Sequence, residues 1–88
     1  MKLKYNFVTN EVAGKIVAVA VGDDMEKFNG FIKMNDISAY IFNMLKDDVT
    51  VDEIVTAMQK DYPDATEQEI RENVEGFIAE LKKSDVID

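Results

Sequence analysis

The chain offers few residue types that can do chemistry. Its 88 residues include no histidine and no cysteine, so a serine nucleophile with an imidazole base and any imidazole or thiolate metal site are excluded. Carboxylates, lysines, one arginine and three tyrosines remain. A hydrolase with paired carboxylates needs a substrate cleft, and so small a core leaves little room for a deep one. The composition therefore predicts a protein that is not an enzyme and holds no metal or other cofactor.

Two short motifs are partial matches to known functional sites, but their spacing does not fit those sites. The acidic segment 47–53 suggests a calcium loop, but it lacks the central glycine and the distal glutamate of an EF-hand. Asp36-Ile37-Ser38 is a faint match to the Asp-Ser-Leu of acyl carrier proteins, in which the serine directly follows the aspartate. Here Ile37 intervenes, and a valine-rich hairpin occupies what would be helix. An acyl or peptidyl carrier protein therefore stays only a weak alternative.

The net charge of −8 is unevenly distributed. Residues 1–34 carry five lysines and four acidic groups, whereas residues 35–88 carry five basic and fourteen acidic groups. A surface this negative repels phosphate backbones. We therefore expect no binding to nucleic acid, and the acidic helix faces are explained at least as well by solubility.

Length and hydropathy predict the domain organisation and the location of the protein. Eighty-eight residues are enough for a single core, so residues 1–88 are expected to form one domain. No run of 18 apolar residues occurs, and the two N-terminal lysines are followed by no apolar signal segment. We expect a cytoplasmic protein that does not bind a membrane.

Hydrophobic periodicity predicts strands first and helices afterwards. Alternation indicates strands over residues 7–12, 15–21 and 28–34, with short connections that make them an antiparallel meander. Helical periodicity follows from Asn35 or Asp36, and capping boxes begin two further helices at Thr50 and Thr66. The fold class is therefore α+β: a three-stranded antiparallel sheet followed by three helices, similar to a winged helix-turn-helix domain, although the strands come first here.

The third predicted strand is the candidate binding element. If it pairs on one side only, its other edge leaves amides and carbonyls open, and only Lys33 defends that edge against a partner strand. Gly30 permits close approach of another backbone. Alternatively, the long helix or a C-terminal strand at Val86 and Ile87 covers the edge. The candidate residues are Phe28, Asn29, Gly30, Phe31, Ile32, Lys33 and Met34.

The long helix adds a second candidate surface. At about 100° per residue, Arg71 and Lys82 fall side by side on the shoulder beyond Ile78, next to Glu75. The two cations can be ordinary partners of acidic neighbours one turn away. Alternatively, they line a groove for a peptide that carries acidic residues.

The ordered set of elements resembles the PqqD-like family, the leader-peptide recognition domains (RiPP recognition elements) of ribosomal peptide natural-product pathways. The segments that carry the resemblance are EVAG at 11–14, NGFIKMN at 29–35, AYIFNML at 39–45, TVDEIV at 50–55 and VEGFIAEL at 74–81. The resemblance covers nearly the whole chain. The chain departs from the pattern at Phe42, where many relatives carry tryptophan, and in loop 22–27.

The resemblance implies a function in peptide modification. In that family the leader of a precursor peptide adds as an antiparallel strand to the third strand and lies against the third helix. By position, the helix residues would be Arg71, Val74, Glu75, Ile78 and Lys82. The resemblance also implies a separate modifying enzyme as partner, commonly a radical S-adenosylmethionine (SAM) maturase, to which this chain acts as a peptide chaperone in natural product biosynthesis.

Two further alternatives stay open from the sequence. A winged-helix DNA-binding or regulatory domain has the same helical plan. An open strand edge can also pair with a second copy, or the N-terminal hairpin can be exchanged, so a homodimer is compatible with the sequence.

Overall fold

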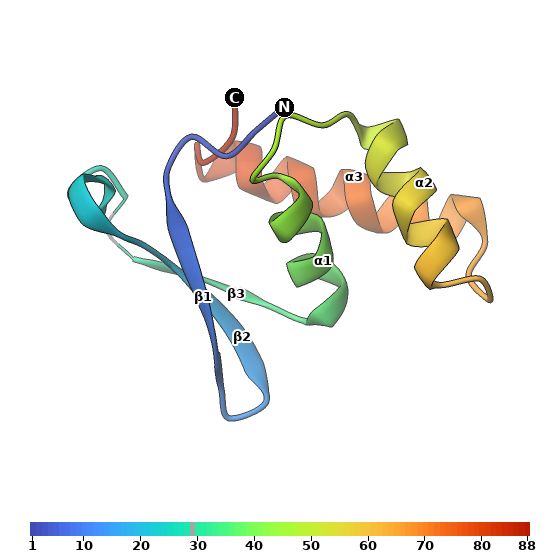
Figure 1. Ribbon diagram of the computed structural model, residues 1–88, viewed down its shortest axis with the longest axis horizontal. Helices are drawn as coiled ribbons and strands as arrows, with labels where there is room; N and C mark the ends of the chain where they lie inside the picture. Colours follow the sequence, from blue (N-terminus) through green and yellow to red (C-terminus); the bar gives the residue numbers. More distant parts are fainter. Residues whose placement is uncertain (29) are drawn as a thin grey trace.

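A computed structural model describes residues 1–28 and 30–88, and it shows a sheet followed by a helical cluster (Figure 1). The elements are β1 (Phe7–Val12), β2 (Lys15–Ala20), the 3-10 turn η1 (Gly22–Met25), β3 (Phe31–Met34), α1 (Asp36–Met44), α2 (Val51–Asp61) and α3 (Glu67–Lys83). The sheet is antiparallel in the order β1-β2-β3. The predicted α+β class, with three strands before three helices, is confirmed.

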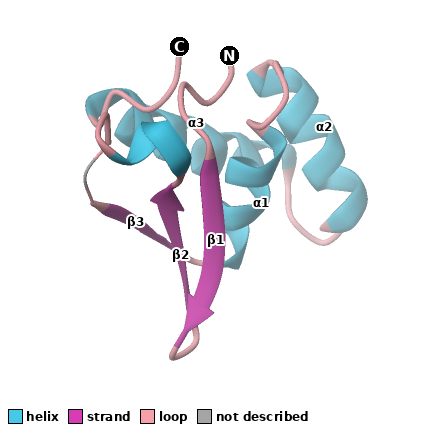
Figure 2. Cartoon of the chain, turned by 60° about the vertical axis from the view of Figure 1, so that its left-hand side comes forward, coloured by secondary structure: helices cyan, strands magenta, loops and turns pink. Residues whose placement is uncertain are grey.

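The sheet has one face toward the helices and one face toward solvent. Ala18 is fully buried and Ala20 nearly so. Phe7, paired with Ala20 on the same face, packs edge-on against Phe42 of α1 with ring centroids 5.3 Å apart. The small side chains of these alanines leave room for the helices on this face of the sheet. The tip of the β1–β2 hairpin projects away from the helices in both views (Figures 1 and 2).

The third strand is shorter than predicted. It begins at Phe31, whereas Phe28 still belongs to the turn: its N–H donates to the carbonyl of Asp24. The Phe28 ring packs edge-on against Phe7, with ring centroids 5.5 Å apart, and stacks beside Tyr5. Phe28 was predicted to belong to the strand, but its side chain packs against the core. Gly30 has φ of 150°, which favours glycine at the entry to β3. The predicted strand position Asn29 lies outside the described residues.

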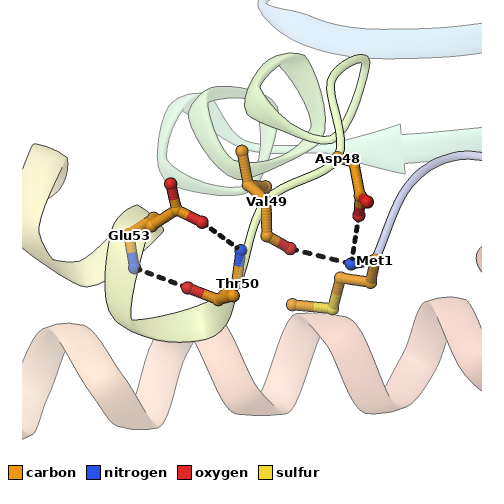
Figure 3. A network of polar contacts seen from close by, with 5 residues as sticks. All are labelled: Met1, Asp48, Val49, Thr50 and Glu53. Atoms are coloured by element: carbon orange, nitrogen blue, oxygen red, sulfur yellow. Dashed lines mark hydrogen bonds and ion pairs between the residues drawn. The ribbon is translucent and has the colours of Figure 1, made fainter.

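Side-chain caps start all three helices where the sequence indicated. The Asn35 side chain accepts from the N–H of Ser38 at 2.8 Å, and Thr66 accepts from the N–H of Glu69 at 3.1 Å. Thr50 and Glu53 form a complete capping box (Figure 3). These bonds satisfy amides that have no partner within the helix.

The two ends of the chain are tied to each other and to the α1–α2 loop. Leu3 and Ile87 form an isolated antiparallel bridge. The Met1 amino group donates to Asp48 at 2.8 Å and to the Val49 carbonyl at 2.9 Å (Figure 3). Both ends lie opposite the hairpin tip (Figure 1). The C-terminal segment therefore pairs with the N-terminal segment and does not cover β3, which removes one of the alternatives for that edge.

No helix within the described residues is long and apolar enough to cross a membrane.

The capping box allows a direct test of the helical cluster. Replacing Thr50 with alanine removes the acceptor for the Glu53 N–H, so we expect the free energy of unfolding to fall by about 1 kcal/mol in urea denaturation followed by circular dichroism. Thr56→Ala, the same chemical change within α2, should leave stability equal or slightly higher because alanine has the better helix propensity. Equal losses in both variants would contradict a specific role for the cap.

Candidate functional site

The outer edge of β3 has no strand partner among the described residues. β3 pairs with β2 alone, with Met34 opposite Ile16 and Ile32 opposite Ala18. In an antiparallel pair, alternate residues direct both their N–H and C=O groups to the same side. Part of the β3 backbone therefore faces away from β2 and is free to bind a further strand.

A groove lies at the C-terminal end of β3, where the β1–β2 turn, the start of α1 and the middle of α3 meet. It consists of two adjoining hollows of about 400 Å³ and 250 Å³ that share Ser38, Phe77 and Glu80. We call them together the β3–α3 groove. Its lining residues are Gly14, Lys15, Lys33, Met34, Asn35, Ser38, Glu72, Asn73, Gly76, Phe77 and Glu80. The groove thus brings the C-terminal part of β3 together with the middle of α3.

The groove has a small apolar floor within a mainly polar lining that carries both signs of charge. Met34 and Phe77, both nearly buried, provide the apolar surface. Lys15 and Lys33 come from the sheet side, whereas Glu72 and Glu80 come from α3. None of these four charged groups belongs to the ion pairs found in the described part of the chain. The Lys33 ammonium lies 5.7 Å from the centre of the exposed Phe31 ring, where the ring face attracts it.

Gly76 lies in the groove and in the interior of a 17-residue helix. A glycine there costs about 1 kcal/mol of helix stability relative to alanine. A Cβ added at Gly76 would meet nothing within 4 Å. Nothing in the free chain therefore requires glycine at this position, whereas a backbone that lies closely over α3 would.

The basic shoulder predicted on α3 faces α2 and not β3. The Arg71 guanidinium donates to Asp52 of α2 at 2.9 Å and to Glu67 at 3.1 Å. These bonds raise the pKa of Arg71 above its usual value. By helical spacing, the exposed residues Glu75 and Lys82 lie on this same side.

Two other predicted helix residues are part of the core. Val74 is fully buried and Ile78 nearly so, and both lie within the apolar stripe that packs in the interior. None of the five predicted α3 positions therefore lines the groove. The physical reason is that an apolar stripe has two shoulders, and helical periodicity does not tell which of them faces the sheet.

The residues missed by sequence reasoning lie on the opposite shoulder: Asn73, Gly76, Phe77 and Glu80. One signal could have indicated them. Gly76 is a helix-interior glycine, a residue type that weakens a helix unless close packing or close approach requires it. On the sheet side, the predicted residues Lys33 and Met34 do line the groove, and Phe31 and Ile32 lie in the same edge strand.

A separate hollow of about 510 Å³ lies between α1 and α2, formed by Tyr40, Ala57, Thr56, Lys60 and three acidic residues. The Tyr40 hydroxyl donates to Asp61 at 2.5 Å. This bond, with the charge of Asp61, raises the pKa of Tyr40 to about 12. This hollow includes no residue of β3. Among the described residues, no group of carboxylates is arranged to hold a metal ion.

The sequence model of the family described as coenzyme PQQ synthesis protein D (PqqD) matches residues 16–87. The chain belongs to the PqqD family. The match includes β3, all three helices and every groove residue except Gly14 and Lys15. A search of the curated proteins finds no relative that matches.

Among solved structures, this PqqD family member is similar to "TbiB1 in Complex with the TbiA(beta) Leader Peptide". The TM-score is 0.75 at 15% sequence identity, and the match covers 100% of this chain and 95% of the other. At this identity the likeness establishes the fold, and it agrees with the order of three strands and three helices.

The Tyr40–Asp61 bond predicts a tyrosine with unusual titration. Because the folded-state pKa is raised from 10.0 to about 12, the stabilising contribution of this bond is complete below about pH 10 and is lost as the pH rises toward 12. In a spectrophotometric titration, one of the three tyrosines should ionise later than the others. Asp61→Asn should shift it to a lower pH, whereas Asp64→Asn, a nearby control, should not. Three tyrosines that ionise together would contradict the hydrogen bond.

Proposed function

We propose that this PqqD family member binds the leader segment of a ribosomally made precursor peptide and presents the peptide to a modifying enzyme, most simply a radical SAM maturase. The observation that carries the proposal is the unpaired edge of β3, with a groove at the C-terminal end of this strand that reaches α3. The leader adds to β3 as an antiparallel strand and rests against α3. The solved structure similar to this chain was determined with a leader peptide, which supports this mode of binding.

Backbone pairing and side-chain contacts contribute differently to peptide binding: the first provides affinity and the second provides selectivity. Hydrogen bonds from the β3 backbone supply affinity that depends little on the peptide sequence. The groove then selects among peptides through Met34 and Phe77 and through its charged walls. On the strand side, we assign the site to Phe31–Met34, which is shorter than the segment 28–34 that the sequence predicted. The helix side is the Asn73, Gly76, Phe77 and Glu80 shoulder in place of the one that carries Arg71 and Lys82.

Presentation to a separate enzyme follows from the chemistry that this chain lacks. It has no histidine or cysteine, so the modification is assigned to the partner. A cytoplasmic setting fits this role, because ribosomally made precursors are available there. The β3 edge can serve one strand at a time, so a homodimer formed through β3 would compete with the peptide.

The DNA-binding alternative gains no support from the structure. In a winged-helix reader the third helix approaches phosphate, but the exposed acidic residues of α3 outnumber its basic ones: Glu67, Glu69, Glu72, Glu75 and Glu80 against Arg71, Lys82 and Lys83. A helix with this charge repels the DNA backbone.

The proposal predicts that the leader alone carries the binding determinant. In calorimetric titrations, a synthetic leader segment of a precursor encoded in the same gene neighbourhood should bind, and the core segment of that precursor should not. Because polar groups and a moderate apolar surface are buried, we expect a Kd of roughly micromolar, equivalent to about −8 kcal/mol. Equal binding of leader and core, or no binding of either, would refute the proposed function.

Gly76 allows a test that separates binding from folding. Gly76→Ala should raise the free energy of unfolding by about 0.5–1 kcal/mol, because alanine favours the helix and its methyl group meets open space. The same methyl group occupies the groove, so leader affinity should fall, and Gly76→Leu should lower it further. Glu75→Ala, on the other side of α3, is the matched control and should leave affinity unchanged. Undiminished binding by the Gly76→Leu variant would remove this part of α3 from the site.

A further inference from the structure

We infer that the leader segment bound here has alternating chemistry: apolar side chains toward α3, and on the other face an acidic side chain opposite Lys33 beside an apolar one at Phe31. This inference rests on the proposed function and specifies the class of peptide that the same site accepts. It follows from the two faces that β3 offers to an added strand.

The side chains of β3 alternate between two environments. Met34 is nearly buried and Ile32 partly buried, on the face that includes Ala18. Phe31 is 58% exposed and Lys33 is exposed, on the opposite face. An added strand continues the pleat, so its side chains lie directly beside those of β3 on each face, with Cβ atoms about 5 Å apart. Each face of the bound peptide therefore meets a different set of residues.

The inward face of the peptide meets an apolar and negatively charged environment. Met34 and Phe77 form the floor, and Glu72 and Glu80 stand on the α3 side. Lys15 and Lys33 line the sheet-side rim of the same groove, but strand alternation directs their side chains to the opposite face from Met34. An acidic side chain directed inward would be desolvated beside like charge, which is unfavourable. Apolar side chains directed inward extend the floor and exclude water from the new backbone hydrogen bonds.

The outward face meets a cation and an aromatic ring. Lys33 takes part in no ion pair among the described residues, and its nearest recorded partner is the Phe31 ring. Phe31 continues an outward row with Val19 and Val8 across the sheet. A carboxylate opposite Lys33 gains a cross-strand ion pair, and an apolar side chain opposite Phe31 extends the row. Acidic charge is therefore accepted on the outward face and rejected on the inward face.

Selection from a random peptide library tests this pattern without knowledge of the natural leader. A displayed library of 12-residue peptides would be panned on the immobilised full chain and, in parallel, on the Lys33→Glu variant. Lys60→Glu, the same charge change on the exposed surface of α2, is the matched control. Enriched peptides would then be synthesised and their affinities measured by fluorescence anisotropy against all three proteins.

The expected result is enrichment of aspartate or glutamate two positions from an apolar residue, with apolar residues between and beside them. On Lys33→Glu the acidic position should change to lysine or arginine, and peptides selected on the unaltered chain should bind this variant about three- to tenfold more weakly. Exchanging that acidic residue for lysine should restore affinity for Lys33→Glu. Lys60→Glu should behave as the unaltered chain does.

Two other outcomes would overturn the inference in distinguishable ways. Peptides that bind the β3–α3 groove, as shown by loss of affinity for Gly76→Leu, but have no charge preference that changes in Lys33→Glu, would refute the alternating pattern and leave the proposed function standing. Failure to enrich any peptide whose binding depends on the groove would refute the proposed function and the inference together.

Discussion

The backbone of an edge strand has half of its hydrogen-bonding groups directed away from the sheet, and in water they bind solvent or another strand. β3 is such a strand: it is four residues long, it pairs only with β2, and no other described strand lies beside it. Proteins usually protect an edge with charge, proline or a covering element. Within the described residues, Lys33 and the shortness of the strand protect this edge, and the β3–α3 groove lies at the C-terminal end of the strand. The location that we propose for the binding site follows from this unpaired edge.

Contacts among the sheet, α1 and α2 determine where α3 lies relative to β3. Fully buried Ala18 brings the helices close to the sheet, and the Phe7–Phe42 contact joins β1 to α1. Arg71 joins α3 to α2 through Asp52, an exposed pair that contributes no more than about 1 kcal/mol. The apolar stripe of α3 packs in the interior, and its Arg71 side contacts α2. Its remaining shoulder, which includes Gly76, is left toward the groove.

Local signals in the sequence were sufficient to predict the helices and strands. They were not sufficient to predict how these elements pack against one another. The capping oxygens of Asn35, Thr50 and Thr66 act within three residues, so the sequence alone locates the helix starts. The beginning of β3 was predicted too early because Phe28 packs on Phe7, a contact across 21 positions that strand alternation does not encode. Which shoulder of α3 faces the groove depends on how α2 packs against the other shoulder. Consequently, the strand side of the site stays a prediction from the sequence, whereas the groove that the structure shows is lined by the other shoulder of α3.

The most direct measurement of the central claim is amide hydrogen exchange at β3, residue by residue, with and without a bound leader peptide. If a strand adds to this edge, alternate amides within Phe31–Met34 should change from solvent-like exchange to strong protection, and amides of the β1–β2 pair should change little. Unchanged exchange throughout β3 in a saturated complex would contradict strand addition. Protection confined to α1 and α2 around Tyr40 would instead place the peptide in the other hollow.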